Sequence, residues 1–306
     1  MHLPLHMLRS LFATGPCIRL ALRVGCVVAM GLAAAAHADE LEGLQLGPHT
    51  YSVSGLPGAA TGDTALGFVV TASSVIVIDT VDSAAQAALL LDAIRQLTPK
   101  PVSHVLLTRQ RAGQTEALAT WKVMGAAIVA RRPAQPAVAA DGAPALRADL
   151  WIDDSTDLLV GGTQIQAVVL TGTTERMAYV LPEDGVLFVG DLAEPGRIPD
   201  LSGRDAREQI ALLDELLKLK ARVVVPARGP AALEAVAGLQ RERDYLAFVQ
   251  DTMGAAVRGA EPFDAAYART DWSRFAALPQ FAALNRANAA AVYQRSVAPL
   301  PLNPAR

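Results

Sequence analysis

The sequence is poor in cysteine and histidine, two residue types that often hold metal ions. It has two cysteines, Cys17 and Cys26, and both precede residue 39. Three of the five histidines lie in the same N-terminal stretch, which leaves His49 and His104 for the rest of the chain. Once that stretch is removed, the chain has no disulfide and no thiolate ligand. Two histidines are also too few for a histidine-rich metal site, and we expect both to be structural.

The first 38 residues have the pattern of a secretory signal peptide. They carry three arginines and no acidic residue, then an apolar run over residues 24–36, then the small-x-small pattern Ala36-His37-Ala38. The run of about 13 residues is shorter than the roughly 20 that span a bilayer. We expect cleavage after Ala38, export to the periplasm and one mature domain over residues 39–306. A buried N-terminal helix is the alternative.

Basic residues are also scarce. Without the three leader arginines, 24 lysines and arginines face 30 aspartates and glutamates, so the net charge falls from −3 to −6. An acidic chain is repelled by nucleic acid and by anionic membrane surfaces. We therefore expect neither as a partner, and no membrane association after cleavage.

The hydrophobic pattern predicts an α/β fold. Two β-branched runs, Leu66–Thr71 and Val75–Asp79, are separated by a short turn and predict a hairpin, and apolar residues at helical spacing predict a helix over Ala84–Leu97. Short strands follow at 104–107 and 127–130, then a second strand-rich stretch over 158–189. Helical pattern dominates from about residue 240, with breaks at the glycine and prolines near 259, 262 and 279. Strands that alternate with helices bury their faces by layering helices onto sheets.

Several short motifs resemble the metallo-β-lactamase superfamily, in the order that family has them. They are VIVIDT at residues 75–80, VLLT at 105–108, VLFVGDL at 186–192 and VVPARGP at 224–230. The resemblance implies a four-layer αββα sandwich with a helical C-terminal extension over about 240–306. The C-terminal sequence, with Asn285, Asn288 and Tyr293, resembles that of a periplasmic branch of the family, which is associated with quinoprotein dehydrogenases and sulfur oxidation.

The zinc-ligand positions of that family are replaced in this sequence. The family binds zinc through His-x-His-x-Asp-His, a later histidine, the aspartate of Gly-Asp and a final Gly-His-Gly. The ligand histidines of the first motif correspond to Arg109, Arg111 and Gln114, and its aspartate to Gly113. The later histidine falls on Gly172 or Thr173, and the final one on Arg228. Only Asp191 is kept.

This replacement argues against a zinc cofactor. Zinc takes about four nitrogen, sulfur or carboxylate ligands, and a catalytic site leaves one position for water. An arginine is never deprotonated in a protein, so it cannot ligate the ion. At 4 Å and an effective dielectric of 20, a divalent cation and a guanidinium repel each other by roughly 8 kcal/mol. We therefore expect no metal, and a degenerate site in place of a metallohydrolase centre.

Two interpretations of the altered pocket remain open. In the first, an arginine pairs with Asp191 and neutralises it; in the second, the surplus arginines bind an anionic small molecule, and the two are compatible. The candidate ligand-binding residues are Arg109, Arg111, Gln114, Thr173, Asp191 and Arg228. The resemblance implies that Asp79 supports the loop after Thr108 by hydrogen bonding.

The sequence leaves the function class open as well. A binding protein would take an anionic metabolite or a partner such as a periplasmic quinoprotein dehydrogenase. The alternative is a hydrolase of an ester, thioester or lactam-type bond with a metal-free or atypical site, in which Asp191 and loop carbonyls hold a weak metal.

Overall fold

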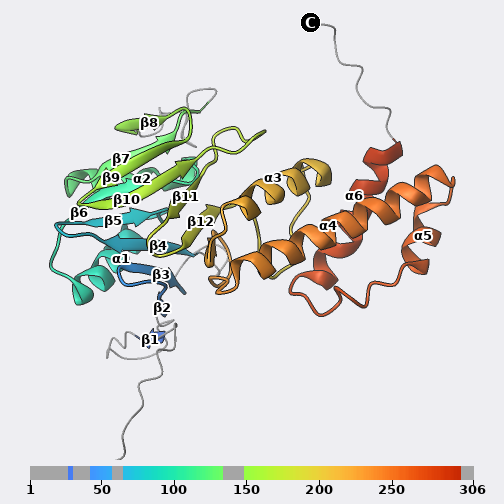
Figure 1. Cartoon of the computed structure of the whole chain (residues 1–306), viewed down its shortest axis with the longest axis horizontal. Coiled ribbons are helices and arrows are strands. Elements are labelled where there is room, and N and C mark those ends of the chain that lie inside the picture. Colours follow the sequence, from blue (N-terminus) through green and yellow to red (C-terminus); the bar gives the residue numbers. More distant parts are fainter. Residues whose placement is uncertain (1–26, 30–41, 57–64, 134–147, 298–306) are drawn as a thin grey trace, which may run out of the picture.

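The computed structural model describes residues 27–29, 42–56, 65–133 and 148–297 (Figure 1). Within these residues there is one eight-stranded sheet, in the order β1 to β8. Pairing is antiparallel from β1 to β5 and parallel from β5 to β8. Its strands are β1 (Val27–Ala29), β2 (Glu42–Gln45), β3 (Thr50–Ser54), β4 (Leu66–Val70), β5 (Val75–Ile78), β6 (Val102–Leu106), β7 (Ala127–Arg131) and β8 (Leu150–Ile152).

The second sheet has five described strands in the order β13-β12-β11-β10-β9. All its pairs are antiparallel except β12 with β13, which are parallel. The strands are β9 (Thr156–Val160), β10 (Thr163–Val168), β11 (Ala178–Leu181), β12 (Val186–Gly190) and β13 (Val223–Pro226). Each sheet therefore contains a parallel pair whose strands end at the same edge, and these two edges supply the site described below.

Helices cover the outer face of each sheet, and the last two helices of the chain pack on another helix and not on a sheet. The helices are α1 (Ala84–Leu97), the short η1 (Ala112–Gln114), α2 (Thr115–Val123), α3 (Ala206–Lys218), α4 (Ala235–Arg258), α5 (Phe263–Arg269) and α6 (Phe281–Val297). Figure 1 shows the sheets on the left and α3 to α6 on the right. Among the described residues, no helix combines the length and the hydropathy that a membrane crossing requires.

Three apolar clusters separate four layers. Strand β5 shows why: Val75 and Val77 pack with α1 and α2 in one cluster, whereas Ile76 and Ile78 pack against the second sheet in another. Successive side chains of a strand point to opposite faces, so a strand buried on both faces is apolar throughout. A third cluster lies between the second sheet and α3, α4 and α6. The layers run α, β, β, α, as the resemblance implied.

Local signals in the sequence located the helices well. The helix predicted over Ala84–Leu97 is α1, and the Ser83 hydroxyl accepts a hydrogen bond from the Gln86 N–H at its start. Asp205 caps α3 in the same way through the Arg207 N–H. The predicted C-terminal breaks are also present, since α4 ends before Gly259 and α5 follows Pro262.

The N-terminal strands were less visible in the sequence. Strands β2 and β3 were not predicted because they are short and mix polar with apolar residues, and β8 was not predicted because it has only three residues. Val27–Ala29, inside the predicted signal peptide, forms β1 and pairs with β2. The remainder of residues 1–38 lies outside the described residues.

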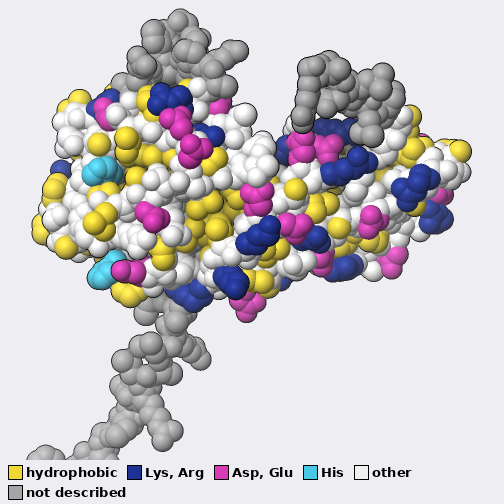
Figure 2. Space-filling view, turned by 45° about the horizontal axis from the view of Figure 1, so that its top comes forward, with side chains coloured by type: hydrophobic (Ala, Val, Ile, Leu, Met, Phe, Trp, Pro, Cys, Tyr) yellow, Lys and Arg dark blue, Asp and Glu magenta, His cyan; other side chains and the backbone are white. Residues whose placement is uncertain are grey.

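The C-terminal helices carry charge of both signs. In Figure 2, acidic and basic side chains lie interspersed over the helical right-hand half of the molecule. Ion pairs join neighbouring helices there, including Arg243 with Asp214 and Arg286 with Asp264. Such exposed pairs contribute about 0–1 kcal/mol each, so packing of the apolar cluster, not charge, holds this layer together.

Candidate functional site

The candidate site lies where the parallel strand pairs of the two sheets end. Asp79 follows β5, Arg109 lies in the loop after β6, Asp191 follows β12, and Arg228 lies just after β13. A backbone hydrogen bond of 3.0 Å from Ala65 N to the Ala227 carbonyl joins the sheets at this edge. Carboxyl ends of parallel strands are a common position for ligand sites in α/β folds, because the loops there converge.

Arg109 and Asp191 form an ion pair at the centre of this edge. Arg109 Nη1 donates to Asp191 Oδ2 over 2.7 Å. The side chains keep 45% and 29% of their exposure, so solvent screens the pair and its net contribution to stability is at most about 1 kcal/mol. The pairing that the sequence left open as one interpretation is therefore present: a guanidinium occupies one oxygen of the retained aspartate.

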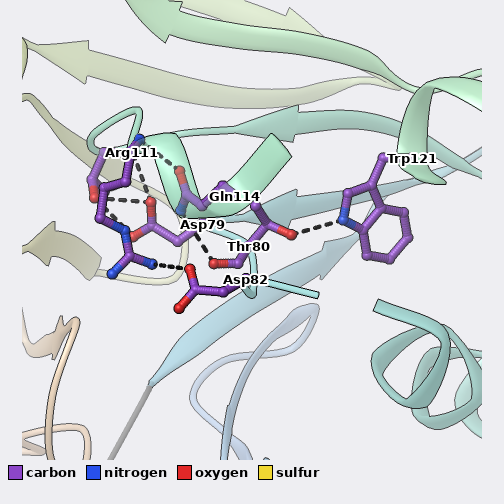
Figure 3. A network of polar contacts seen from close by, with 7 residues as sticks. Asp79, Thr80, Asp82, Arg111, Gln114 and Trp121 are labelled. Carbon is purple, nitrogen blue, oxygen red and sulfur yellow. Dashed lines mark hydrogen bonds and ion pairs between the residues drawn. The ribbon is translucent and has the colours of Figure 1, made fainter. Parts of the chain in front are cut away.

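Contacts of Arg111 and Gln114 hold the C-terminal end of the loop that carries Arg109 (Figure 3). Gln114 is buried; its Oε1 accepts the Arg111 N–H at 3.0 Å and its Nε2 donates to the Thr80 carbonyl at 3.3 Å. Trp121 Nε1 donates to Thr80 Oγ1 at 2.8 Å, and Arg111 Nη2 lies 3.2 Å from Asp82 Oδ1. Gln114 therefore orders the loop, and Arg111 already has an acidic partner.

Asp79 supports the same loop, as the resemblance implied. Its carboxylate accepts the Thr108 N–H at 2.8 Å and lies 2.8 and 2.9 Å from the Thr108 hydroxyl. Asp79 has a φ of 61°, a left-handed backbone that aspartate tolerates better than most residues. Burial raises the pKa of Asp79 to about 6, although the hydrogen bonds from Thr108 oppose that rise. The Asp79 carboxyl is therefore mostly ionised at pH 7.

Two adjoining cavities open beside the Arg109–Asp191 pair. The first, which we call the Asp191 lobe, has a volume of about 180 Å³, and its polar lining includes Arg109, Asp191, Glu194, Asp200, Arg204 and Arg228. The second, the Asp79 lobe, has a volume of about 210 Å³ and includes Asp79, Asp82, Thr108, Arg111 and Gln114. Arg109, Asp191 and Arg228 line both lobes, so the ion pair stands between them.

The charge of the Asp191 lobe is more balanced than the sequence suggested. Glu194 and Asp200 line it together with Asp191, and so do Arg109, Arg204 and Arg228. The Ser202 N–H lowers the pKa of Asp200, and the charges of Arg204 and Arg228 lower it further, so Asp200 is ionised. The lobe therefore presents separate positive and negative groups, not a uniform positive surface.

Two arginines outside the predicted ligand-binding set also belong to this region. Arg204 precedes the capping residue of α3 and gave no signal in the sequence. Arg176 lies in the turn before β11, and its backbone forms an isolated bridge with Arg109. Partial burial lowers the pKa of Arg176, and the charge of Asp191 opposes this while Arg204 and Arg109 add to it. Arg176 and Arg204 thus belong to the same electrostatic cluster as the predicted residues.

Some predicted residues lie elsewhere. Thr173 lines neither lobe; it is buried, and its hydroxyl donates to the Leu170 carbonyl at 2.6 Å. His49 is exposed at the turn before β3, and His104 contacts Ser103 Oγ on β6, so neither reaches the cavities. Arg228 is exposed, and no hydrogen bond or ion pair joins it to another described residue. Of the predicted set, Arg228 is the cation most available to a ligand.

The residues of the site do not fit a zinc ion. Within the described part of the chain, no three histidine, cysteine, aspartate or glutamate side chains gather as a metal site would require. Three of the aspartates that line the lobes are already engaged, Asp191 by Arg109, Asp82 by Arg111 and Asp79 by Thr108. Two guanidinium groups beside these carboxylates oppose a divalent cation.

Comparisons with known proteins agree with the architecture. Residues 115–228 match the sequence model of the metallo-beta-lactamase superfamily. A solved metallo-beta-lactamase from Pontibacter korlensis is 20% identical, with a TM-score of 0.57, over 68% of this chain and 99% of its own. The stereoselective inverting sec-alkylsulfatase Pisa1 from Pseudomonas sp. is 18% identical, with a TM-score of 0.64, over 86% of this chain. This chain spans 52% of the alkylsulfatase, about half of its length. No curated protein sequence matches the chain.

Proposed function

We propose that this chain, which has the metallo-β-lactamase fold, is a zinc-independent member of that superfamily that binds a small anionic molecule in the Asp191 lobe. The observation that carries the proposal is the 2.7 Å contact between Arg109 Nη1 and Asp191 Oδ2. That contact places a permanent cation on the one carboxylate that the family's ligand set retains. An arginine there favours anions and disfavours metal ions, because guanidinium groups bind carboxylate, phosphate and sulfate through charge-assisted hydrogen bonds.

The size of the cavity favours a small molecule over a partner protein. Ligand pockets for drug-sized molecules occupy roughly 300–1,000 Å³. The Asp191 lobe, at about 180 Å³, suits a ligand of a few heavy atoms. A partner such as a quinoprotein dehydrogenase would need a broad docking face, and the arginines of the lobe instead converge on a concave site.

The hydrolase alternative has less support. Its chemistry requires a nucleophile with a base in hydrogen-bond reach, or an activated water. The described hydroxyls at the Asp79 lobe are engaged: Thr80 accepts from Trp121, and Thr108 contacts both oxygens of Asp79. No histidine lines either lobe within the described residues. We therefore favour binding over turnover.

Two measurements test the proposal together. Elemental analysis of protein incubated with zinc and then desalted is expected to give far less than one zinc per chain. Small anions, including sulfate, methyl sulfate and short carboxylates, are expected to raise the melting temperature; methyl sulfate is included because one structural relative is an alkylsulfatase. A ligand at 100 times its Kd stabilises by about 2.7 kcal/mol, or roughly 5–10 °C for a domain of this size.

Arg228→Ala gives the matched variant. Because Arg228 is exposed and forms no contact that holds the fold, we expect it to fold normally but to bind anions about 10-fold or more weakly. Arg132→Ala is the control, since Arg132 is paired with Asp153 and lines neither lobe. About one zinc per chain, or equal anion affinity in both variants, would overturn the proposal.

We also propose that the chain is exported and processed after Ala38. The arginine-containing leader and the Ala36-His37-Ala38 pattern support this. Expression in a Gram-negative host is expected to give a periplasmic protein whose intact mass is that of a chain beginning at Asp39. A protein that stays cytoplasmic and retains residues 1–38 would contradict the proposal.

A further inference from the structure

Two residues that line the Asp191 lobe each have a buried polar atom without a hydrogen-bond partner. Asp191 Oδ2 accepts from Arg109, but the other oxygen, Asp191 Oδ1, is buried without a hydrogen bond. Arg204 Nη1 is also buried without a hydrogen bond. Both residues line the same cavity of about 180 Å³. A buried charged group without a hydrogen bond costs more than about 1–3 kcal/mol, so these atoms indicate what a ligand would satisfy.

The two atoms require hydrogen-bond partners of opposite type. A carboxylate oxygen can only accept a hydrogen bond, and a guanidinium nitrogen can only donate one. Sulfate and simple carboxylates offer acceptors alone, so they would satisfy Arg204 and place an oxygen against Asp191 Oδ1. A molecule that satisfies both atoms must carry a hydrogen-bond donor next to its anionic group.

The surrounding charges are of both signs. Glu194 and Asp200 line the lobe with Asp191, and these acidic groups favour a hydroxyl or an ammonium group on the ligand. Arg204 and Arg228 line the lobe as well and favour a carboxylate. Resting on the proposed anion-binding function, we infer that the ligand is a small carboxylate with a hydroxyl or amino group on the adjacent carbon, bound with its carboxylate toward Arg204 and Arg228 and its donor toward Asp191.

The volume agrees with this class. A water molecule takes roughly 30 Å³ of liquid, so about 180 Å³ corresponds to about six such shares, comparable with a ligand of about six heavy atoms. Lactate and alanine have that size, and propionate is the matched probe without the donor. The three probes share a carboxylate and differ only in the substituent that would face Asp191.

Isothermal titration with lactate, alanine, propionate and sulfate at fixed ionic strength tests the inference. We expect lactate or alanine to bind at least 10-fold more tightly than propionate, and the stronger of the two identifies the donor as hydroxyl or ammonium. If propionate binds as tightly as both, the donor inference is wrong while the anion-binding function stands. If none of the four binds, the proposed function itself fails.

Asp191→Asn tests the contact directly. Arg109 requires an oxygen at the Oδ2 position, so the amide nitrogen takes the place of Oδ1 and presents a donor to the ligand's donor. The ratio of the affinity for the tighter of lactate and alanine to the affinity for propionate is expected to fall to about one. Asp153→Asn, at an exposed aspartate outside both lobes, is the control and should keep the preference. Melting curves of both variants show that each is folded, and a preference unchanged in Asp191→Asn would overturn the inference.

Discussion

Glu242→Gln is expected to stabilise the protein by an amount that grows with pH between about 4.5 and 8. Glu242 lies on α4 and is 1% exposed. Its Oε2 accepts the Glu194 N–H at 2.7 Å, and Gln209 Nε2 lies 3.4 Å from Oε1. Burial raises the pKa of Glu242 from 4.5 to about 8, and the charge of Glu194 adds to the rise, although the Glu194 N–H opposes it.

The direction in which stability changes with pH follows from proton linkage. Below pH 4.5 the carboxyl is protonated in both the folded and the unfolded chain, so its ionisation does not affect stability. Above pH 4.5 the unfolded chain releases the proton while the folded protein keeps it up to about pH 8. Folding must therefore take up a proton, and stability falls as pH rises through this window. At one pKa unit per 1.36 kcal/mol, the loss reaches roughly 3–5 kcal/mol at pH 8.

Glutamine removes this loss because it cannot ionise and still offers an oxygen to the Glu194 N–H. Urea unfolding at pH 5, 6, 7 and 8 should show a gap between variant and parent that widens steadily. Glu208→Gln, an exposed glutamate on α3, is the control and should show no such widening. A gap independent of pH would mean that Glu242 is ionised in the folded protein.

Gly190→Ala is expected to destabilise the protein by roughly 2–5 kcal/mol. Gly190 has a φ of 54°, and a β-carbon there would lie 2.1 Å from Thr108 Oγ1 and 2.7 Å from Thr108 Cβ. The left-handed backbone costs alanine about 1–2 kcal/mol, and overpacking adds about 1–3 kcal/mol. Thr108 cannot rotate away without losing its contacts with Asp79, at 2.8 to 2.9 Å.

Gly172→Ala provides the matched control. Gly172 also has a positive φ, of 72°, but nothing lies within 4 Å of the position of its added β-carbon. The free energy of unfolding of Gly172→Ala should fall only by the backbone cost of about 1–2 kcal/mol. The difference between the two variants therefore measures the contact with Thr108. Thermal unfolding at one pH suffices to compare them. Equal losses would show that Thr108 adjusts and that the Asp79–Thr108 contact does not fix this edge of the sheet.

Gly190→Ala also links stability to the site. Gly190 immediately precedes Asp191, so a shift that relieves the contact with Thr108 moves the carboxylate that Arg109 holds. The variant is therefore expected to weaken anion binding as well as unfold earlier.

The sequence predicted most of the fold, because the sequence patterns that specify these strands and helices are local. The run VIVI at residues 75–78 is apolar throughout, as expected of a strand buried on both faces, and Ser83 and Asp205 occupy the N-cap positions of their helices. Strands β2 and β3 escaped prediction because their stability comes from pairing with distant residues, such as Thr50 with Val69, and not from their own pattern.

The site was readable only in part. Motif order placed Arg109, Arg111, Gln114, Asp191 and Arg228 at one edge, and all five line the cavities. It could not assign partners: Arg111 pairs with Asp82, and Thr173 turns toward the Leu170 carbonyl. Arg204 and Glu194 had no sequence signal because they reach the site from the segment between β12 and α3.

By itself, the sequence determined the layered α/β architecture and the arginines at positions that correspond to zinc ligands in the metallo-β-lactamase motifs, since both are properties of residue type and spacing along the chain. The tertiary structure decided which charges meet. Arg109 neutralises one oxygen of Asp191, the other oxygen and Arg204 Nη1 stay without partners, and Glu194 and Asp200 balance the arginines. Electrostatic energy depends on distance and burial, and only the folded chain fixes those between residues far apart in sequence.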